Sequence, residues 1–137
     1  MSEAATKEQP QVDMTPGIFS WNELATSDAA GSAQFYTNLF DWKVESIPGM
    51  DGYKMMMAGD RMVAGCMDKS EHCDGPALWL SYVTVADVKA SLAKAVEHGG
   101  EAFKEVTEVP GRGAFAIVKD PQGAMIGLWE FSGECPG

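Results

Sequence analysis

The sequence predicts an α+β fold of two βαβββ modules that together form one cupped mixed sheet. Strand and helix signals occur twice in the same order along the 137 residues. Asp28 and Asp87 each stand just before a helical pattern, where an aspartate caps the first turn, and they lie 59 residues apart (87 − 28). Neither half could bury both faces of a four-stranded sheet alone, so the halves should share a core. The face without a helix is left to line a concavity, where a small-molecule site is expected.

Each module should consist of a strand, a helix and three further strands. Alternating apolar and polar residues mark the strands, and glycine turns separate several of them. Module one, residues 17–68, has its helix expected at 28–40 and its strands at 18–25, 42–47, 53–58 and 62–67. Module two, residues 77–132, has its helix expected between Asp87 and Gly99 and its strands at 78–85, 102–109, 113–119 and 124–131.

Each helix is expected to bury one apolar face, formed by residues at i,i+4 spacing. In the first helix these residues are Phe35 with Leu39 and Tyr36 with Phe40. In the second helix they are Val88, Leu92 and Val96.

The chain length predicts one domain, at residues 17–132. Residues 1–16 lack the apolar centre of a secretory signal, so they are not expected to be one. They are expected to be a flexible tail. Residues 69–76 should link the modules, and residues 133–137 should form a short C-terminal tail.

The net charge of −10 argues against nucleic-acid and anionic-membrane partners, because the chain has too few cations to neutralise phosphates. The acidic surface suits a cationic ligand or, more simply, solubility. No apolar run reaches the ~20 residues of a membrane helix. The three cysteines, at 66, 73 and 135, do not form a disulfide framework, which indicates a reducing cytoplasm.

Several motifs, in order, resemble the vicinal oxygen chelate superfamily, which includes glyoxalase I, the bleomycin-resistance proteins and the extradiol dioxygenases. The likeness covers residues 17–131 and is greatest to a glyoxalase-related bacterial branch. It implies paired βαβββ modules around a cupped sheet, commonly in a homodimer. The motifs are Trp21-Asn22-Glu23-Leu24, Phe35-Tyr36, Leu39-Phe40, Trp42, Gly99-Gly100 and Asp120-Pro121-Gln122-Gly123-Ala124.

The resemblance also implies where a divalent metal would be held. One ligand is expected on the first strand and one on the last strand of each module, which corresponds here to Trp21, Gly65, Leu80 and Gly127. None of these residues has a metal-donor side chain. We therefore expect no metal site and no cofactor. Gly127 is interpreted as space kept open in a cup that has lost its metal.

Strand alternation predicts the lining of the cup. The expected lining is aromatic and rich in thioethers, with a carboxylate and a phenol as its polar groups. The carboxylate of Glu23 costs several kcal/mol on an inward face unless it is paired, hydrated or protonated. Arg61 or Arg112 could pair with it, and the aromatic residues could equally fill a collapsed core. The lining residues are Phe19, Trp21, Glu23, Met67, Leu80, Tyr82, Met125, Gly127 and Trp129.

Three functions fit this pattern. The first is binding of a small, partly apolar or cationic molecule without a metal. The second is a lyase, isomerase or oxygenase-related enzyme in which Glu23 acts as general base and Tyr82 as its partner. The third is a non-catalytic role in which the pocket serves only dimer packing. Glu23 and Tyr82 occupy equivalent positions of the two modules (82 − 23 = 59), so they are expected to face each other across the cup.

Overall fold

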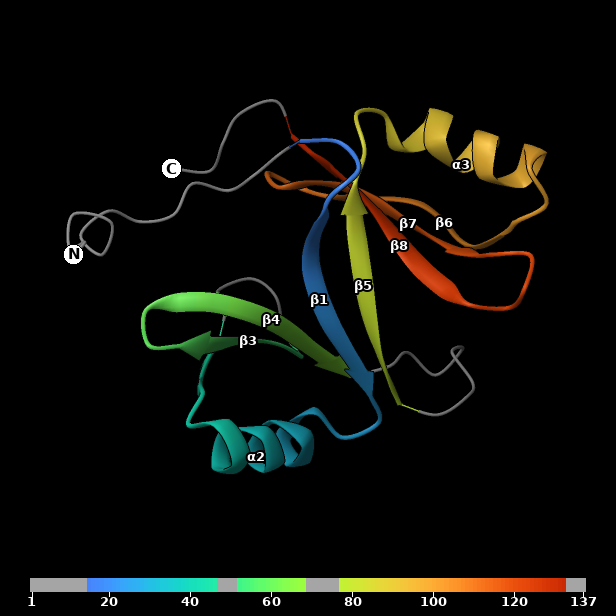
Figure 1. The fold of residues 1–137 in the computed structure, drawn as a ribbon. Coiled ribbons are helices and arrows are strands. Elements are labelled where there is room, and N and C mark those ends of the chain that lie inside the picture. The colour runs from blue at the N-terminus through green and yellow to red at the C-terminus, as the bar shows by residue number, and fades with distance from the viewer. Residues whose placement is uncertain (1–14, 47–51, 69–76, 133–137) are drawn as a thin grey trace, which may run out of the picture.

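The computed structural model describes residues 15–46, 52–68 and 77–132, and its strands form a single eight-stranded sheet (Figure 1). The order of the strands is β2-β3-β4-β1-β5-β8-β7-β6. Module one comprises β1 (Phe19–Thr26), α2 (Ala29–Phe40), β2 (Lys43–Ser46), β3 (Tyr53–Ala58) and β4 (Arg61–Asp68). Module two comprises β5 (Leu78–Thr84), α3 (Val88–Glu97), β6 (Glu101–Val109), β7 (Gly113–Lys119) and β8 (Met125–Phe131).

The predicted fold of two βαβββ modules in a mixed sheet is confirmed. The expected N-terminal tail up to residue 14, the linker at 69–76 and the C-terminal tail at 133–137 lie outside the described residues. Within the described ranges, no helix is long and apolar enough to cross a membrane.

An approximate two-fold relation joins the modules at their first strands. β1 and β5 are antiparallel, and Asn22 lies opposite Ser81, its equivalent 59 residues later (81 − 22). The Ser81 hydroxyl donates a 2.8 Å hydrogen bond to Oδ1 of Asn22. Each first strand also pairs in parallel with the last strand of its own module, β1 with β4 and β5 with β8. The sheet is therefore continuous through the centre of the molecule.

An aspartate caps the start of each helix. Asp28 accepts from the N–H of Gly31 at 2.9 Å, and Asp87 accepts from the N–H groups of Lys89 and Ala90. These bonds satisfy donors that the first helical turn leaves free. The predicted caps are thus confirmed at equivalent helices.

A second carboxylate reaches each helix from the last strand of its module, which the sequence analysis did not foresee. Oδ1 of Asp68 accepts from the first helical N–H of α2, at Ala29, and Oε1 of Glu130 accepts from that of α3, at Val88. Both bonds are 2.8 Å long. They tie β4 to α2 and β8 to α3 in the same way.

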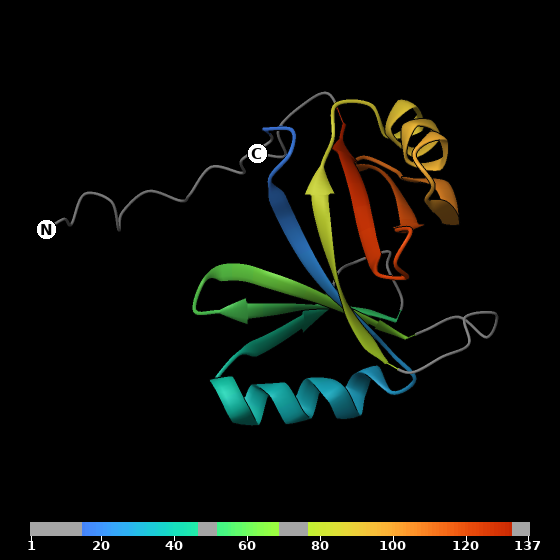
Figure 2. The same cartoon turned by 45° about the vertical axis from the view of Figure 1, so that its right-hand side comes forward.

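Both helices cover the same side of the sheet, each over its own module (Figure 2). The core beneath α2 consists of Leu24, Ala29, Met56 and Cys66, and the core beneath α3 consists of Val88, Leu92, Ala116 and Val118. Burial of a large apolar side chain contributes roughly 1.5–3 kcal/mol. These two cores hold the strands in place and leave the opposite side of the sheet for a site.

The predicted buried face of the first helix is wrong for three of its four residues, and of the four only Tyr36 packs against the core beneath α2. Phe35, Leu39 and Phe40 are 59%, 57% and 50% exposed, whereas Ala29 and Ala33 are buried. Small residues, Ala29 and Ala33, are the buried residues of this helix. In the second helix, Val88 and Leu92 are buried as predicted but Val96 is half exposed.

Candidate functional site

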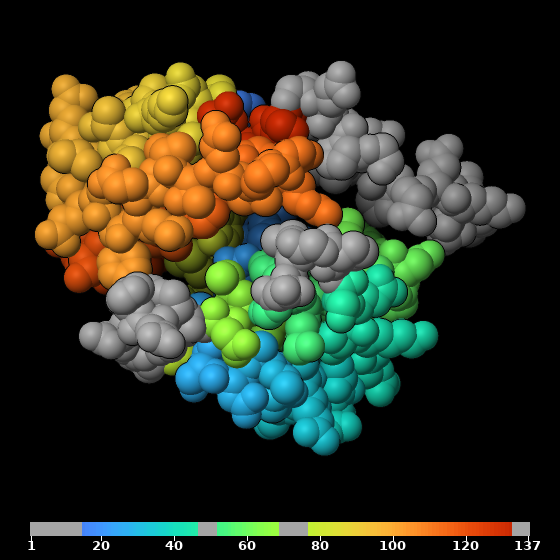
Figure 3. All heavy atoms as spheres, turned by 180° about the vertical axis from the view of Figure 1, so that it is seen from behind, coloured from blue at the N-terminus to red at the C-terminus, as the bar shows by residue number. Residues whose placement is uncertain are grey.

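The helix-free side of the sheet is hollowed between the two modules, with parts of β1 and β5 at the bottom (Figure 3). We call this hollow the cup. Residues that lie directly opposite in neighbouring strands share a face. Trp21 lies opposite Tyr82, and Tyr82 lies beside Gly127, so these three residues face the cup together. Glu23 is likewise flanked by Gly65 and Leu80 on that face.

Four side chains at the floor of the cup form a hydrogen-bonded group, which we call the Glu23 cluster: Trp21, Glu23, Tyr53 and Tyr82. The Tyr82 hydroxyl donates to Oε1 of Glu23 at 3.0 Å. The indole N–H of Trp21 donates to the Tyr53 hydroxyl at 3.3 Å. The Tyr53 hydroxyl in turn is hydrogen-bonded to the Glu23 carboxylate.

The expected proximity of Glu23 and Tyr82 is therefore confirmed. Among the described residues, the hydrogen-bond partners of this carboxylate are two phenols rather than Arg61 or Arg112. The sequence analysis missed Tyr53. Its place at the start of a predicted strand gave no sign that its ring would cross the neighbouring strand toward Glu23.

Burial changes the pKa values of the three ionisable groups in the Glu23 cluster, which are Glu23, Tyr53 and Tyr82. Burial raises the pKa of Glu23, and the hydrogen bonds from Tyr53 and Tyr82 lower it in part. Burial also raises the pKa of both tyrosines, and the negative charge of Glu23 raises it further. Both phenols thus keep their protons at neutral pH and act as donors to the carboxylate.

All the donors of the Glu23 cluster point inward. Trp21 gives its N–H to the oxygen of Tyr53, and both phenols give their O–H to Glu23. An ionised carboxylate can accept about four hydrogen bonds, and a phenol oxygen keeps an acceptor lone pair. Toward a ligand, the cluster with ionised Glu23 can therefore act only as an acceptor and as a negative charge.

The two cup-facing glycines provide the space for the tyrosine rings. A Cβ placed on Gly127 would lie within 2.8 Å of Cγ of Tyr82 and closer to other atoms of that ring. A Cβ placed on Gly65 would meet the hydroxyl end of Tyr53. This corrects the interpretation of Gly127: the space in front of it is filled by Tyr82 and is not left open for a ligand.

The other predicted lining residues lie around the cluster. Leu80 is buried, whereas Met67, Met125 and Trp129 are half-buried on the faces shared by Gly65 and Gly127. Phe19 is a correction, because it is 67% exposed. A bulge between Phe19 and Trp21 places Phe19 opposite Val83 and reverses the expected alternation, so Phe19 does not share the face of Trp21.

The cup does not fit the divalent metal that the resemblance implies. The first-strand positions hold an indole and an isobutyl group, at Trp21 and Leu80. At the last-strand positions, Gly65 and Gly127, tyrosine rings take the space that a carboxylate side chain would need. Within residues 15–46, 52–68 and 77–132, no three His, Cys, Asp or Glu side chains lie together as a metal site.

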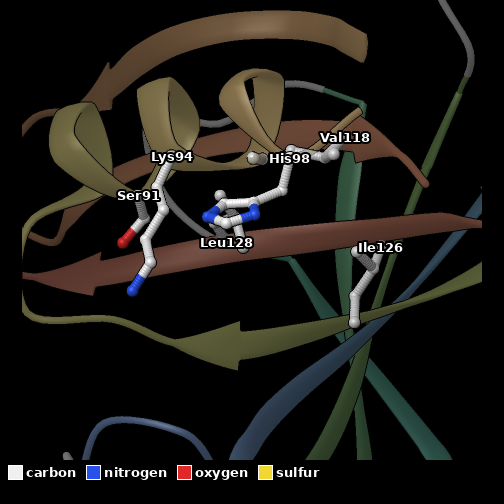
Figure 4. A pocket seen from close by; sticks show the side chains of 7 residues that line it. Ser91, Lys94, His98, Val118, Ile126 and Leu128 are labelled. Carbon is white, nitrogen blue, oxygen red and sulfur yellow. The ribbon is translucent and has the colours of Figure 1, made fainter. Parts of the chain in front are cut away.

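Two open grooves lie on the helix side of the sheet, away from the Glu23 cluster. One, of about 290 Å³, lies between α3 and strands β7 and β8, with Lys94 and His98 above Leu128 (Figure 4). The other, of about 310 Å³, lies beside α2. Cys66 is fully buried under α2, and burial raises the pKa of its thiol, so it is not placed to act as a nucleophile.

Comparison with known proteins identifies the class. Residues 18–128 match the model of the Glyoxalase/Bleomycin resistance protein/Dioxygenase superfamily, and the chain belongs to this family. The putative glyoxylase CFP32 of Mycobacterium tuberculosis is 32% identical over 119 residues, which cover 83% of this chain and 46% of the relative. The anthracycline biosynthesis protein DnrV of Streptomyces peucetius is 33% identical over 129 residues, covering 83% and 47%. The chain thus spans about half the length of these curated relatives.

Solved structures support the fold alone, because their sequence identities are low. The hypothetical protein BH1468 of Bacillus halodurans has a TM-score of 0.61 at 14% identity, covering 90% of this chain and 100% of its own. A superfamily member from Vibrio splendidus has a TM-score of 0.56 at 14% identity, covering 80% and 96%. The Mn(II)-bound glyoxalase of Novosphingobium aromaticivorans has a TM-score of 0.55 at 14% identity, covering 84% and 39%.

Proposed function

We propose that this chain is a metal-independent member of its family that binds a small, partly apolar molecule in the cup through a cationic or hydrogen-bond-donating group. The observation behind this proposal is the donor count of the Glu23 cluster. The N–H and O–H groups of Trp21, Tyr53 and Tyr82 donate hydrogen bonds to one another and to Glu23. The cluster therefore offers a ligand only acceptor atoms and a negative charge. Aromatic faces beside a carboxylate suit an organic cation.

The names of the relatives, a putative glyoxylase and an anthracycline biosynthesis protein, are compatible with a small organic ligand. The apolar part of such a ligand would lie against Trp21, Leu80 and Phe115, whose ring packs edge-on at 6.1 Å from that of Tyr82. The cytoplasmic location expected from the cysteine pattern stays a prediction.

The test is a matched pair of probes, 2-phenylethylamine and phenylacetate, which place an ammonium or a carboxylate on the same kind of aromatic body. The amine should raise the melting temperature of the wild-type protein, because a ligand that binds only the folded state stabilises it. Phenylacetate should not. Glu23→Gln should abolish the shift, whereas Glu45→Gln, which removes an exposed carboxylate on β2, should preserve it. Equal shifts from both probes would overturn the proposal.

The absence of a metal has its own test. Dialysis against EDTA should leave the melting temperature unchanged, because loss of a bound ion would remove its linkage stabilisation. Elemental analysis of untagged protein should show well under one equivalent of Zn, Ni, Mn or Fe. A stoichiometric ion bound through Glu23 would contradict this part of the proposal.

The second candidate is an enzyme in which Glu23 acts as general base with Tyr82 as its partner. The raised pKa of Glu23 favours it, since a base works best when its pKa lies near the working pH. Deuterium uptake at a carbon acid in D₂O, catalysed by the wild type and lost in Glu23→Gln, would support the enzyme. Failure of all probes to bind or react would favour the third hypothesis, a cup that serves only dimer packing.

A further inference from the structure

The groove between α3 and the strands beneath it, which we call the α3 groove, combines a polar wall with an apolar floor (Figure 4). The wall comes from one face of the helix, because its residues follow one another at spacings of three and four. The floor comes from β7 and β8. The wall residues are Ser91, Lys94 and His98, and the floor residues are Val118, Ile126 and Leu128.

The α3 groove is open where a small residue replaces the aromatic ring of module one. Ala95 also lines the groove, and its counterpart in the first helix is Tyr36 (95 − 59). The Tyr36 ring packs against the core beneath α2 and against Trp79, with the two ring centroids 5.3 Å apart. The two helices are equivalent elements of their modules, so the repeated fold does not itself require a groove here.

The floor of the α3 groove differs from module one in the same way. The two cup-facing glycines occupy equivalent positions of the last strands, and the residues that follow them are Cys66 and Leu128. Cys66 is fully buried under α2, whereas Leu128 remains half-buried beside α3. Module two therefore keeps an apolar floor accessible at a place that module one covers.

The α3 groove also differs from the rest of the chain in charge. The chain has 20 acidic and 10 basic residues, yet among the described residues no carboxylate lines the groove, and its ionisable groups are Lys94 and His98. Within residues 15–46, 52–68 and 77–132, neither side chain has a hydrogen-bond or ion-pair partner. Their donors are therefore available to a ligand.

We propose that the α3 groove binds one small carboxylate amphiphile, a medium-chain fatty carboxylate, with its head at Lys94 and His98 and its chain on the apolar floor. The groove volume of about 290 Å³ lies near the lower end of small-molecule sites, which suits a single short chain. Lys94 supplies a positive charge, and Ser91 supplies a hydroxyl donor beside it. Contact with the chain removes apolar surface of the floor from water.

The test is a ¹H–¹⁵N NMR titration with octanoate and octylamine, which have the same alkyl length and opposite charges at pH 7. Octanoate should produce saturable shifts in the amide signals of residues 91–98 and 126–128. Octylamine should leave these signals in place, because Lys94 repels its ammonium group.

Three variants locate the head and the chain of the ligand. Lys94→Glu should weaken octanoate binding about tenfold or more, since repulsion replaces attraction. Lys89→Glu is the matched control, because it makes the same charge change at an exposed position of α3 outside the groove, and it should retain wild-type affinity. Ala95→Tyr, which copies the residue of module one, should fill the groove and abolish binding while the circular dichroism spectrum stays that of a folded protein.

Lack of saturable octanoate shifts in the wild type would overturn the proposal, as would shifts that fall on the Glu23 cluster instead of α3. Equal losses in both lysine variants, or undiminished binding by a folded Ala95→Tyr protein, would overturn it as well. Lys94→Glu decides the question if Ala95→Tyr does not fold. The cup lies on the other side of the sheet and is tested with 2-phenylethylamine and Glu23→Gln, so each proposal can fail without the other.

Discussion

The Tyr82 hydroxyl donates a 3.0 Å hydrogen bond to Oε1 of Glu23, and these two residues occupy equivalent positions of the two modules. The antiparallel pairing of β1 and β5 explains the contact. Its centre is the pair Asn22 and Ser81, which are each other's equivalents. Glu23 and Tyr82 each follow a residue of this central pair by one position. They therefore lie on the same face of the sheet, diagonally across the pair. A carboxylate at one such position and a phenol at the other therefore meet.

The stability of the protein should depend on pH through Glu23. Its folded-state pKa is raised, so between the unfolded and folded pKa values the folded state binds more protons. The contribution of Glu23 to stability is therefore highest at a pH below its pKa in the unfolded protein. It is lost as the pH rises from that value through the raised pKa of the folded protein. Glu23→Gln lacks this titration. The melting temperature of Glu23→Gln relative to that of the wild type should therefore increase from pH 5 to pH 8.

Comparison at each pH isolates Glu23, since every other titrating group is present in both proteins. Glu45→Gln should show no such trend, because that carboxylate is exposed on β2. A constant difference between wild type and Glu23→Gln across this range would show that burial does not control the carboxyl.

The phenols should stabilise the ionised form of Glu23. Tyr82→Phe removes the donor at 3.0 Å while retaining the ring that fills the space at Gly127. A hydrogen bond to a charged group contributes about 1.5–3 kcal/mol, so urea denaturation at pH 8 should show a loss of that size. The loss should be smaller at pH 5, where more of Glu23 is protonated. Equal losses at both pH values would mean that the hydroxyl acts through packing alone.

Much of the fold could be predicted because its signals are local or repeated. Asp28 and Asp87 cap helices at a fixed offset, and the strands alternate on either side of them. That offset also identified Glu23 and Tyr82 as equivalents. It could not identify Tyr53, whose ring reaches Glu23 across β4. The offset of 59 residues does not extend to the last strands of the modules, where the equivalent glycines Gly65 and Gly127 lie 62 residues apart (127 − 65).

The errors arose where tertiary packing selects between local alternatives. One extra residue in β1 displaced Phe19 from the cup face, and a bulge leaves little trace in a single strand pattern. In α2 both a small-residue stripe and an aromatic stripe have helical spacing. The close approach of the helix to β1 and β4 selects Ala29 and Ala33 and leaves Phe35 outside. Exposed aromatic residues on the outer side of a helix were therefore mistaken for core.

The carboxylates that reach the helix starts should each contribute to stability. Glu130→Ala removes the acceptor for the N–H of Val88, and Asp68→Ala removes the acceptor for that of Ala29. Loss of a capping acceptor costs about 0.5–2 kcal/mol, and both variants should fall in that range by urea denaturation. Glu108→Ala, at an exposed position on β6, should change stability by less than about 0.5 kcal/mol. If all three variants behave alike, the two strand-to-helix bonds are without energetic importance.

Gly127 should be needed for the Tyr82 ring rather than for a ligand. A methyl group at this position would collide with that ring, and forcing extra atoms into a packed site costs about 1–3 kcal/mol. Gly127→Ala should be destabilised by this amount in urea denaturation. Tyr82→Val removes the ring atoms in the way, so adding Gly127→Ala to it should cost little or nothing. A coupling energy of about 0.5–3 kcal/mol between the two changes is then expected. The same penalty in both backgrounds would mean that a neighbour other than Tyr82 prevents a larger side chain at Gly127. If Gly127→Ala is as stable as the wild type, the space at this position is open and available to a ligand.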